Sequence, residues 1–367
     1  MKAQVLITTA AGRTGSVAAR ELVRRGYPVR GLVRRDDHRA AALRNAGVEV
    51  VVGDLFDWRD LTRALDGVQL AYHCPPFDAQ HLHGAAIFAL AAEQAGVEVV
   101  ALMSGWNPHP LHPSVLQREH WVANNLYRRQ TFDVIHINPG MFGWTYFLGL
   151  PAVVHFGMLA LPLGDGLNAP PSSEDVGRVA AGALADPANY VGRCLRPTGP
   201  HLITPSEAAE SMGRALGRRV RYTAVSEKSF VKAARAMGFP TFQIAQVRHY
   251  AHELRNGAFD GVSDHVEEVT GIPPDDFDTI AARYLDDPTR VAPDMRRGSR
   301  LAAARLALRI ATTPSIDLDD WERTRDYPLI SNGLRADQNR EWQSTAQRGE
   351  LSLLPKPPDR QPLARPV

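Results

Sequence analysis

The feature that most constrains this chain is a regular alternation of short β-rich runs and longer helical patterns over its first 140 residues. The expected strands are Gln4–Thr8, Val29–Val33, Val48–Val52, Leu70–Cys74, Glu98–Met103 and Asp133–Asn138. The expected helices are Ser16–Arg25, Asp37–Ala46, Arg59–Leu65, Ala79–Ala95 and Val115–Arg129. Continuous apolar strands are typical of a sheet buried on both faces, and helical crossovers make its strands parallel. The pattern predicts an α/β fold with a doubly wound parallel Rossmann sheet.

The alternation fades from about Pro151 onward, which predicts a smaller, mixed and mostly helical cap. Its expected helices are Ser173–Ala185, Pro205–Leu216, Glu227–Met237 and Phe242–Arg255, with a short β pair formed by Cys194–Pro197 and Val220–Ala224. Asp286-Asp287-Pro288 looks like a boundary. We therefore divide the chain into a Rossmann domain (1–150, to which some later segments return), a substrate or cap domain (151–286) and an extension (287–367). The extension carries a basic helix, Arg296–Ala311, and a Pro-rich tail, Leu354–Val367, expected to be extended or disordered.

The composition places limits on partners and on chemistry. The 42 basic and 40 acidic residues nearly cancel, so nucleic acid is not expected as a partner. The four lysines are Lys2, Lys228, Lys232 and Lys356. A mechanism that needs an active-site Lys therefore has almost nowhere to place one. The basic helix is expected to be a solvated face or an oligomer contact, such as a homodimer interface, rather than a contact with an anionic surface.

One uncharged segment, Met141–Gly164, is long enough to suggest a membrane span. It contains Pro151, Pro162, His155 and four glycines, and no basic flank follows it. We therefore expect a buried segment that lines a pocket. Two cysteines make no disulfide framework, and no signal-peptide pattern is evident, so we expect a soluble, cytoplasmic protein.

A glycine-containing turn joins the first expected strand to the first expected helix. In such a turn the small residues allow a tight bend, and the N–H groups at the helix start face a pyrophosphate. A G-x-x-G-x-x-G loop would place glycine where this chain has Thr9, and a β-branched residue resists a positive φ. This turn must therefore differ slightly or be strained. The expected cofactor contacts in it are Thr8, Thr9, Ala11, Gly12, Arg13, Thr14 and Gly15.

Arg34 and Arg35 follow the second expected strand, where an NAD site would carry Asp or Glu for the ribose 2′-OH. A guanidinium at that point matches a 2′-phosphate in bidentate geometry, and Arg13 would reach the same phosphate. The alternative is that an Arg-rich chain scatters arginines everywhere and that Asp36-Asp37 pairs with these two. The sequence predicts NADP(H).

Three further strand ends complete the expected site. After the third strand, Asp54 is placed to accept from the adenine amino group, with Leu55 along the ring. The fourth strand ends near Pro75 and the fifth near Ser104, and both ends would face the nicotinamide. Ser104 is either a polar group at the reaction centre or only a strand-end cap.

Taken together, these residues resemble the NmrA-like family of atypical short-chain dehydrogenases, over about residues 1–286. The resemblance implies a Rossmann fold, NADP(H) binding and a reductase activity. It departs from the family motifs at Thr9, Ala11, Asn138 and Ile272. The matching segments are Thr8–Gly15, Arg34, Gly53–Leu55, Pro139–Phe142, Asp175–Ala181, Ile203–Ala209 and Glu267–Phe277.

Catalysis is less clearly indicated. A Tyr-x-x-x-Lys pair is excluded, because Tyr72 and Tyr127 are followed four residues later by Pro76 and Thr131. The NmrA-like reductases place a Lys about nineteen residues before the Pro of their R-P-G motif, and that position here is His120. A His there would shuttle a proton near neutral pH. Arg118 or Glu119 would take the place after a small shift, and a merely packed histidine is an equal alternative.

Other histidines do not point to a metal. His81, His83, His109 and His112 have no carboxylate or Cys partner at ligand spacing, so no metal site is expected. The Pro-rich loop that carries His109 and His112 is expected to border the substrate pocket.

Three hypotheses of function follow. The first is an NADP(H)-dependent reductase of a small carbonyl, quinone or conjugated alkene bound under the cap. The second is a catalytically inactive NADP(H) sensor that regulates a partner. The third is a scaffold with a vacant Rossmann fold.

Overall fold

The computed structural model describes residues 2–288, 290–292, 295–325 and 333–354. Its main sheet has seven parallel strands in the order β3-β2-β1-β4-β5-β6-β8. They are β1 (Val5–Ile7), β2 (Val29–Val33), β3 (Glu49–Val52), β4 (Leu70–His73), β5 (Val99–Met103), β6 (Asp133–Ile137) and β8 (Cys194–Leu195). The strands β2 and β3 lie on one side of β1, and the later strands β4, β5 and β6 lie on the other side. The point between β1 and β4 where the strand order switches is where such sheets bind ligands, at their carboxyl edge. The predicted doubly wound α/β fold is confirmed.

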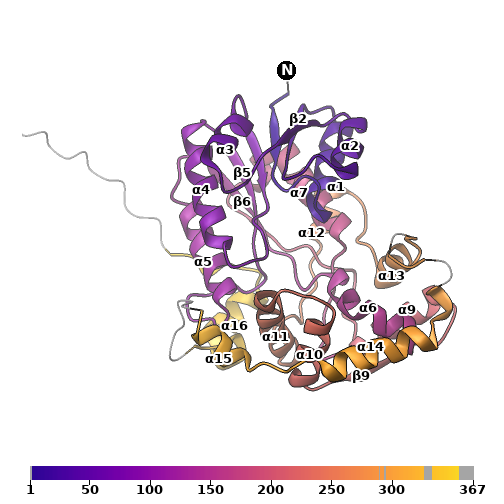
Figure 1. Ribbon diagram of the computed structural model, residues 1–367. Coiled ribbons are helices and arrows are strands. Elements are labelled where there is room, and N and C mark those ends of the chain that lie inside the picture. The colour runs from indigo at the N-terminus through magenta and orange to yellow at the C-terminus, as the bar shows by residue number, and fades with distance from the viewer. Residues whose placement is uncertain (1, 289, 293–294, 326–332, 355–367) are drawn as a thin grey trace, which may run out of the picture.

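Helices cover both faces of this sheet (Figure 1). One layer contains α3 (Trp58–Leu65), α4 (His81–Gln94) and α5 (Val115–Tyr127). The other contains α1 (Arg13–Arg24), α2 (His38–Asn45), α7 (Ser173–Ala185) and α12 (His265–Thr270), and the short α8 (Pro187–Tyr190) follows α7. Two buried clusters result because successive strand residues point to opposite faces: Val5 and Ile7 join the α1 side, and Leu6 joins the α4 side.

Two helices of the second layer approach each other closely. Gly177 of α7 faces α1, and a Cβ at that position would lie 2.7 Å from both the Thr14 carbonyl oxygen and the Val17 Cβ. No side chain larger than hydrogen fits there. The glycine of the Asp175–Ala181 segment therefore sets how near α7 comes to the helix that follows the turn.

The remaining elements form the cap below the sheet's carboxyl edge (Figure 1). They are η1 (Gly143–Gly149), α6 (Leu150–Phe156), β7 (Met158–Leu161), α9 (Pro205–Leu216), β9 (Arg221–Ala224), α10 (Glu227–Ala236), α11 (Thr241–Arg255) and α13 (Phe277–Leu285). The segment Met141–Gly164 supplies three of them. The expected division of the chain at residues 150 and 286 stays a prediction, while α7, β8 and α12 are later segments that lie on the sheet.

The predicted pairing of Cys194–Pro197 with Val220–Ala224 is wrong. Cys194 and Leu195 instead pair with His136 and Ile137 at the edge of the main sheet. Arg221–Ala224 pairs in parallel with Met158–Leu161 in a separate two-stranded sheet. The edge of β6 offers unpaired backbone groups that β8 satisfies, and a local pattern does not reveal which edge a short strand will find.

The extension packs against the cap. It contains η2 (Met295–Arg297), α14 (Arg300–Thr312), α15 (Leu318–Arg323), η3 (Ala336–Gln338) and α16 (Arg340–Gln347). The basic helix begins at Arg300 rather than Arg296, because Gly298 has a φ of 73° and the Ser299 side chain caps the helix at Ala302. Val291 and Leu318 join the cap core. Residues 355–367 of the predicted tail lie outside the described residues.

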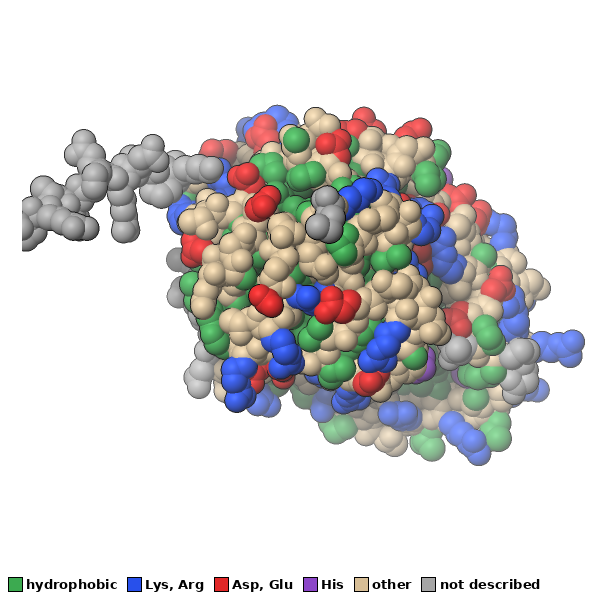
Figure 2. Space-filling view, turned by 90° about the horizontal axis from the view of Figure 1, so that it is seen from above, with side chains coloured by type: hydrophobic (Ala, Val, Ile, Leu, Met, Phe, Trp, Pro, Cys, Tyr) green, Lys and Arg blue, Asp and Glu red, His purple; other side chains and the backbone are tan. Residues whose placement is uncertain are grey.

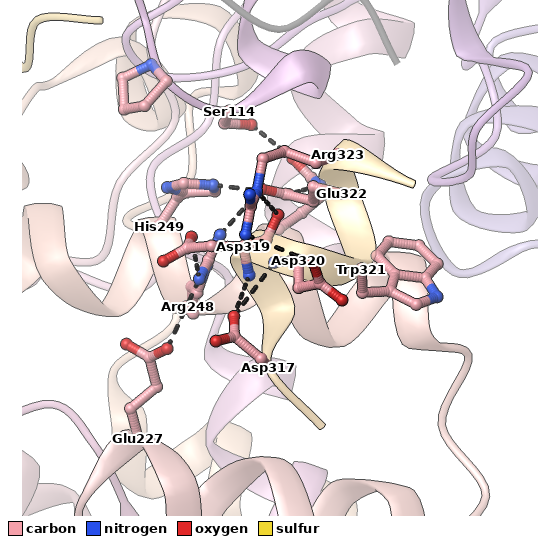
Figure 3. A network of polar contacts seen from close by, with 12 residues as sticks. Ser114, Glu227, Arg248, His249, Asp317, Asp319, Asp320, Trp321, Glu322 and Arg323 are labelled. Atoms are coloured by element: carbon pink, nitrogen blue, oxygen red, sulfur yellow. Dashed lines mark hydrogen bonds and ion pairs between the residues drawn. The ribbon is translucent and has the colours of Figure 1, made fainter. Parts of the chain in front are cut away.

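A buried charge network fastens α15 to α11 (Figure 3). Glu322 is 5% exposed and accepts from Arg248 at 2.8 Å and from Gln246 Nε2 at 3.3 Å, with His249 Nε2 at 3.7 Å. Arg248 also pairs with Asp319 at 2.7 Å. Burial by itself would raise the pKa of Glu322, but its contact with His249 and the charge of Arg248 bring that pKa below its usual value. The carboxylate is therefore charged at neutral pH and holds the extension in place.

Within the described residues, no helix combines the length and the apolar character that crossing a membrane requires. Figure 2 shows acidic and basic side chains interspersed on the face above the sheet. That face carries no broad field of a single sign.

Replacing Glu322 by Gln should destabilise the protein by about 2 kcal/mol, since a buried charge-assisted contact is lost. Wild-type stability should keep this contribution above about pH 4.3 and lose it as the pH falls through the lowered folded-state pKa, whereas the variant should lack it throughout. Denaturant unfolding at several pH values measures both effects. Arg323→Gln is the matched control, because its ion pair with Asp320 is exposed and should matter by less than about 0.5 kcal/mol. Equal losses in the two variants would contradict this account of the network.

Candidate functional site

A large cavity of about 620 Å³ lies between the carboxyl edge of the main sheet and the cap. The sheet side is formed by the ends of β1, β4, β5 and β6 and the loops that follow them. The cap side is apolar, and its aromatic residues are Trp144, Phe147, Phe230, Phe239, Tyr250, Phe259 and Tyr284. No Asp, Glu or Lys is found among the described residues that line it. Met141 and Leu161 belong to its wall, so the uncharged segment Met141–Gly164 does border a pocket.

The turn after β1 forms one end of this cavity. Thr9 has a φ of 47°, a left-handed conformation that is costly for a β-branched residue. Its carbonyl oxygen would lie 2.9 Å from a Cβ at Gly12 and 2.6 Å from a Cβ at Gly15. The turn therefore requires glycine at both positions. Of the two outcomes expected for Thr9, a changed turn or a strained one, the structure has the strained one. Its hydroxyl donates to the Cys74 carbonyl at 3.4 Å.

Helix α1 starts at this turn without a side-chain cap. Gly12 is its N-cap residue, and no acidic residue lies in its first turn. The first N–H groups of the helix, with their partial positive charge, are thus free of a side-chain acceptor at the exposed end. Thr14 is held by the Tyr72 hydroxyl at 3.2 Å, and the Arg13 guanidinium lies 4.5 Å from the centre of the Trp144 ring. This helix end can accept an anion.

Arg34 and Arg35 are exposed at the carboxyl end of β2. Asp36 pairs with Arg44 at 2.7 Å, and Asp37 pairs with Arg39 at 2.6 Å. The two nearby carboxylates are therefore occupied elsewhere, which removes the alternative that they neutralise Arg34 and Arg35. Neither guanidinium makes an ion pair or hydrogen bond within the described part of the chain.

The other expected cofactor contacts take different positions. Thr8 is fully buried, and its hydroxyl accepts from the Cys74 N–H at 3.0 Å, so its side chain supports the turn from below. Ala11 and Leu55 are half-buried and Asp54 is exposed, with its carboxylate accepting from the Phe56 N–H at 3.0 Å. Of the expected contacts, those that line the cavity are Thr9, Gly12, Arg13, Thr14 and Pro75.

Two histidines meet at the sheet side of the cavity. The rings of His81 and His120 are 4.1 Å apart and edge-on. His81 Nδ1 lies 3.2 Å from the Pro76 carbonyl oxygen, which only accepts, so this nitrogen carries the proton. Burial lowers the pKa of His81 to about 4. Burial, and then His81, lowers the pKa of His120 well below its usual range. Both rings are neutral at pH 7, so His120 lacks the near-neutral pKa expected from the sequence.

His120 is the member of the Arg118-Glu119-His120 segment that lines the cavity. The Arg118 side chain donates to the carbonyl oxygens of His112 and Pro113. Glu119 has its pKa raised to about 7 by burial, but it does not line the cavity. The structure thus separates three residues that the sequence left as alternatives.

Several buried polar atoms near His120 lack partners within the described residues. Ser104 Oγ is one of them, and Ser104 lines the cavity. The Gln117 amide has no partner either, and its Oε1 would lie 2.4 Å from a Cβ at Gly105. Unpaired buried polar groups are costly, so this cluster has spare hydrogen-bonding capacity for a bound group.

Sequence reasoning missed Gln117, Trp106 and the cap aromatics outside Met141–Gly164, which are Phe230, Phe239, Tyr250, Phe259 and Tyr284. Trp106 follows the end of β5 by three positions, so the rule that sites form at carboxyl strand ends would have found it. The cap aromatics come from separate segments between residues 144 and 284, and their convergence has no local signal.

The Pro-rich loop does not border the large cavity through its histidines. His109 stacks on Trp342 of α16 with ring centres 4.0 Å apart, and His112 Nε2 is 2.8 Å from a Glu253 carboxylate oxygen. One group, Asp264, His265 and Glu268, has potential ligand atoms within 4.8 Å of one another. It is largely exposed, and Glu268 already pairs with Arg193.

The chain is similar to several known proteins. Residues 1–123 match the model of the NmrA-like family, which confirms the resemblance over that part of the chain. The chain is 29% identical over 283 residues to an NAD(P)H azoreductase of Xenophilus azovorans, covering 76% of this chain and 97% of that protein.

Solved structures share the fold. An NADPH-dependent quinone oxidoreductase of Escherichia coli, complexed with NADPH, superposes with a TM-score of 0.67 at 22% identity, covering 76% of this chain and 99% of the other. NmrA, a negative transcriptional regulator in complex with NAD, has a TM-score of 0.62 at 16% identity, covering 77% and 94%. Each of these matches leaves roughly a quarter of this chain uncovered.

Replacing Thr9 by Gly should stabilise the protein by up to about 1 kcal/mol, because relief of about 1–2 kcal/mol of left-handed strain exceeds the added backbone entropy of glycine. The midpoint of denaturant unfolding measures this. Thr8→Gly is the control, and it should destabilise because Thr8 is buried and hydrogen-bonded. A clear loss of stability in Thr9→Gly would show that the Thr9 side-chain contacts outweigh its strain.

Proposed function

We propose that this NmrA-like protein is an NADP(H)-dependent oxidoreductase that reduces a small carbonyl, quinone or conjugated alkene. One observation carries the proposal: a single cavity reaches from the turn before α1, past the carboxyl ends of β4 and β5, to the aromatic wall of the cap. A dinucleotide lying along that edge would bring its reactive ring beside an acceptor held by the cap.

The residues present fit NADP(H). The Gly12–Thr14 turn offers uncapped helix N–H groups to a pyrophosphate. Arg34 and Arg35 are free to hold a 2′-phosphate, and Arg13 lies at the mouth of the same turn. Asp54 and Leu55, at the end of β3, are the proposed neighbours of the adenine. Arg34 and Arg35 occupy the two positions directly after β2, where an NAD site would carry an acidic residue for the 2′-hydroxyl.

Arg34→Ala should remove most of the preference for NADPH over NADH. The charge-assisted contact that it loses is worth about 1.5–3 kcal/mol, so NADPH affinity should fall roughly ten- to hundredfold while NADH affinity changes little. Calorimetric titration with both nucleotides measures the two constants. Arg24→Ala is the matched control, because Arg24 is exposed in the last turn of α1, at the end of the helix opposite the turn, and pairs with Glu21. Equal affinity of the intact protein for NADPH and NADH would refute the assignment.

When bound, the cofactor supplies a hydride. The protein's part is to hold the acceptor in line and to place a hydrogen-bond donor at the oxygen that gains charge. The aromatic wall excludes water and favours a flat, conjugated acceptor. The described lining holds Arg13 and Arg290 but no Asp or Glu, so a cationic acceptor is a poor fit. Azo and quinone acceptors, named for the relatives, belong to this flat class.

His120 and Ser104 are the proposed donors. A neutral imidazole still donates one N–H, and Ser104 Oγ has no partner within the described residues. Neither group stores a proton as a cation at pH 7. The proton that completes reduction of a carbonyl or quinone would therefore come from solvent and reach the product oxygen through these groups.

His120→Ala should lower turnover by about 10²-fold with little change in NADPH affinity, because one positioned donor is lost. The pH profile of wild-type kcat/KM should show no inflection from this histidine near about pH 6.5, since its pKa lies well below that value. His83→Ala is the control, because His83 is exposed and outside the cavity. Unimpaired turnover in His120→Ala would remove this role.

A nucleotide sensor without turnover is the second candidate. It is favoured by the neutral state of His120 and by the fold shared with a negative transcriptional regulator. A screen of NADPH oxidation against quinones, azo dyes and aldehydes separates the two. Stabilisation by NADPH with no oxidation in the whole screen would favour the sensor.

We also propose a cytoplasmic location and a homodimer. Both cysteines, Cys74 and Cys194, are unpaired, which suits a reducing compartment that supplies NADPH. The basic helix α14 exposes Leu301 and Leu308, 60% and 66% accessible, and is the proposed dimer contact. Sedimentation of the protein, and of a Leu301→Glu variant, tests the contact.

A further inference from the structure

Tyr250 is a polar residue within the aromatic wall of the cap. It belongs to the face of α11 that lines the large cavity, together with Gln243, Ile244 and Val247. Successive turns of the helix supply these residues, at spacings of three and four positions, so their side chains leave the same side of the helix. Tyr250 therefore extends from the cap toward the cavity.

The ring of Tyr250 lies opposite the carboxyl ends of β4 and β5. Its centre is 6.2 Å from that of Phe77, in the loop after β4, and 6.4 Å from that of Phe259. Phe259 in turn stacks on Trp106, in the loop after β5, with ring centres 6.1 Å apart. These two strand ends are the ones expected to face the nicotinamide. Tyr250 thus approaches the expected reaction centre from the cap, whereas His120 approaches it from the sheet.

The Tyr250 hydroxyl is open to the cavity. It makes no hydrogen bond with the described residues. The Tyr146 hydroxyl is also unpaired within the described chain but is enclosed by protein atoms, whereas the Tyr250 oxygen retains accessible surface. Tyr250 is half-buried and lines the cavity, so a bound molecule can reach this oxygen. A buried tyrosine usually has a hydrogen-bond partner for its hydroxyl, and here the cavity is where that partner would bind.

This hydroxyl is protonated at neutral pH. Burial, and then the charge of the nearby Glu253 carboxylate, raises the pKa of Tyr250 above its usual value. Glu253 accepts from His112 Nε2 at 2.8 Å and leaves the Tyr250 hydroxyl to other acceptors. A phenol in this state donates a hydrogen bond and does not act as a base.

We propose that the Tyr250 hydroxyl donates a hydrogen bond to the oxygen of the bound acceptor, from the cap side of the cavity. This role rests on the proposed reductase function. When a hydride adds to a carbonyl carbon, its electron pair forms the new C–H bond and the C=O π pair moves onto the oxygen. The Tyr250 O–H stabilises that developing charge, and the proton of the product hydroxyl comes from solvent. Tyr250 is thus a catalytic residue that polarises the acceptor and keeps its own proton.

The same contact selects among acceptors. A flat acceptor with a carbonyl oxygen at its cap-facing edge gains the hydrogen bond. A hydrocarbon edge would instead bury the hydroxyl without a partner in an apolar wall, which costs free energy. Quinones and aromatic carbonyl compounds therefore fit this site better than an alkene that is conjugated only with carbon.

The test compares the full-length protein with Tyr250→Phe, using menadione as a quinone probe. With NADPH, we expect the variant to lower kcat/KM for menadione about 10- to 100-fold at unchanged NADPH affinity. With NADP⁺ bound no hydride is available, and we expect the infrared carbonyl band of bound menadione to lie at higher frequency in the variant, because its oxygen loses a hydrogen bond. A merely packed ring would move neither quantity. Tyr190→Phe is the control, because Tyr190 belongs to α8 and lies outside the cavity.

An unchanged carbonyl frequency in Tyr250→Phe would overturn the contact, and an unchanged kcat/KM would overturn the catalytic role. Absence of saturable menadione binding by the wild type would overturn both. A clearly lower Tm in Tyr250→Phe would also count against the proposal, because no hydrogen bond to a described residue is lost. If the wild type binds menadione but oxidises no NADPH, the reductase function fails, and the infrared comparison decides whether Tyr250 contacts the ligand.

Discussion

The turn between β1 and α1 is the constraint on which the rest of the site depends. Thr9 is held at positive φ, and its carbonyl oxygen lies where any side chain at position 12 or 15 would have its Cβ. That arrangement aims the uncapped start of α1 at the cavity and brings Thr14 under the Tyr72 hydroxyl. Gly177 then lets α7 pack directly on α1, so the strained turn is held between the sheet and a tightly packed helix pair.

The chemistry available in the cavity follows from what surrounds it. The cap contributes rings, and the sheet contributes small polar groups that have lost contact with water. In such surroundings a histidine is neutral, and a carboxylate or ammonium would be costly. The site therefore suits reactions in which a hydride arrives from a cofactor and the protein supplies orientation and weak donors.

Buried charge decides how the extension attaches. The negative charge of Glu322 is compensated by Arg248 and its neighbours on α11. This contact holds α15 of the extension against the cap. Arg196 is the opposite case, a buried cation at a junction with α16 that no described carboxylate completes. The free-energy cost of burying a charge is thus offset at Glu322 by charged partners, whereas Arg196 contacts only the Trp106 ring and the Ala346 carbonyl.

The sequence by itself determined the sheet, because strands buried on both faces must be apolar throughout and the helices between them must repeat every 3.6 residues. It also pointed to the strain at Thr9 and the free arginines after β2, since both depend on the immediate chain neighbourhood. Only the tertiary structure decided that β8 pairs with β6 and that His120, rather than Arg118 or Glu119, faces the cavity. It alone decided the neutral state of His120 and the isolation of Arg196, because burial and counter-charge are set by segments distant in the chain.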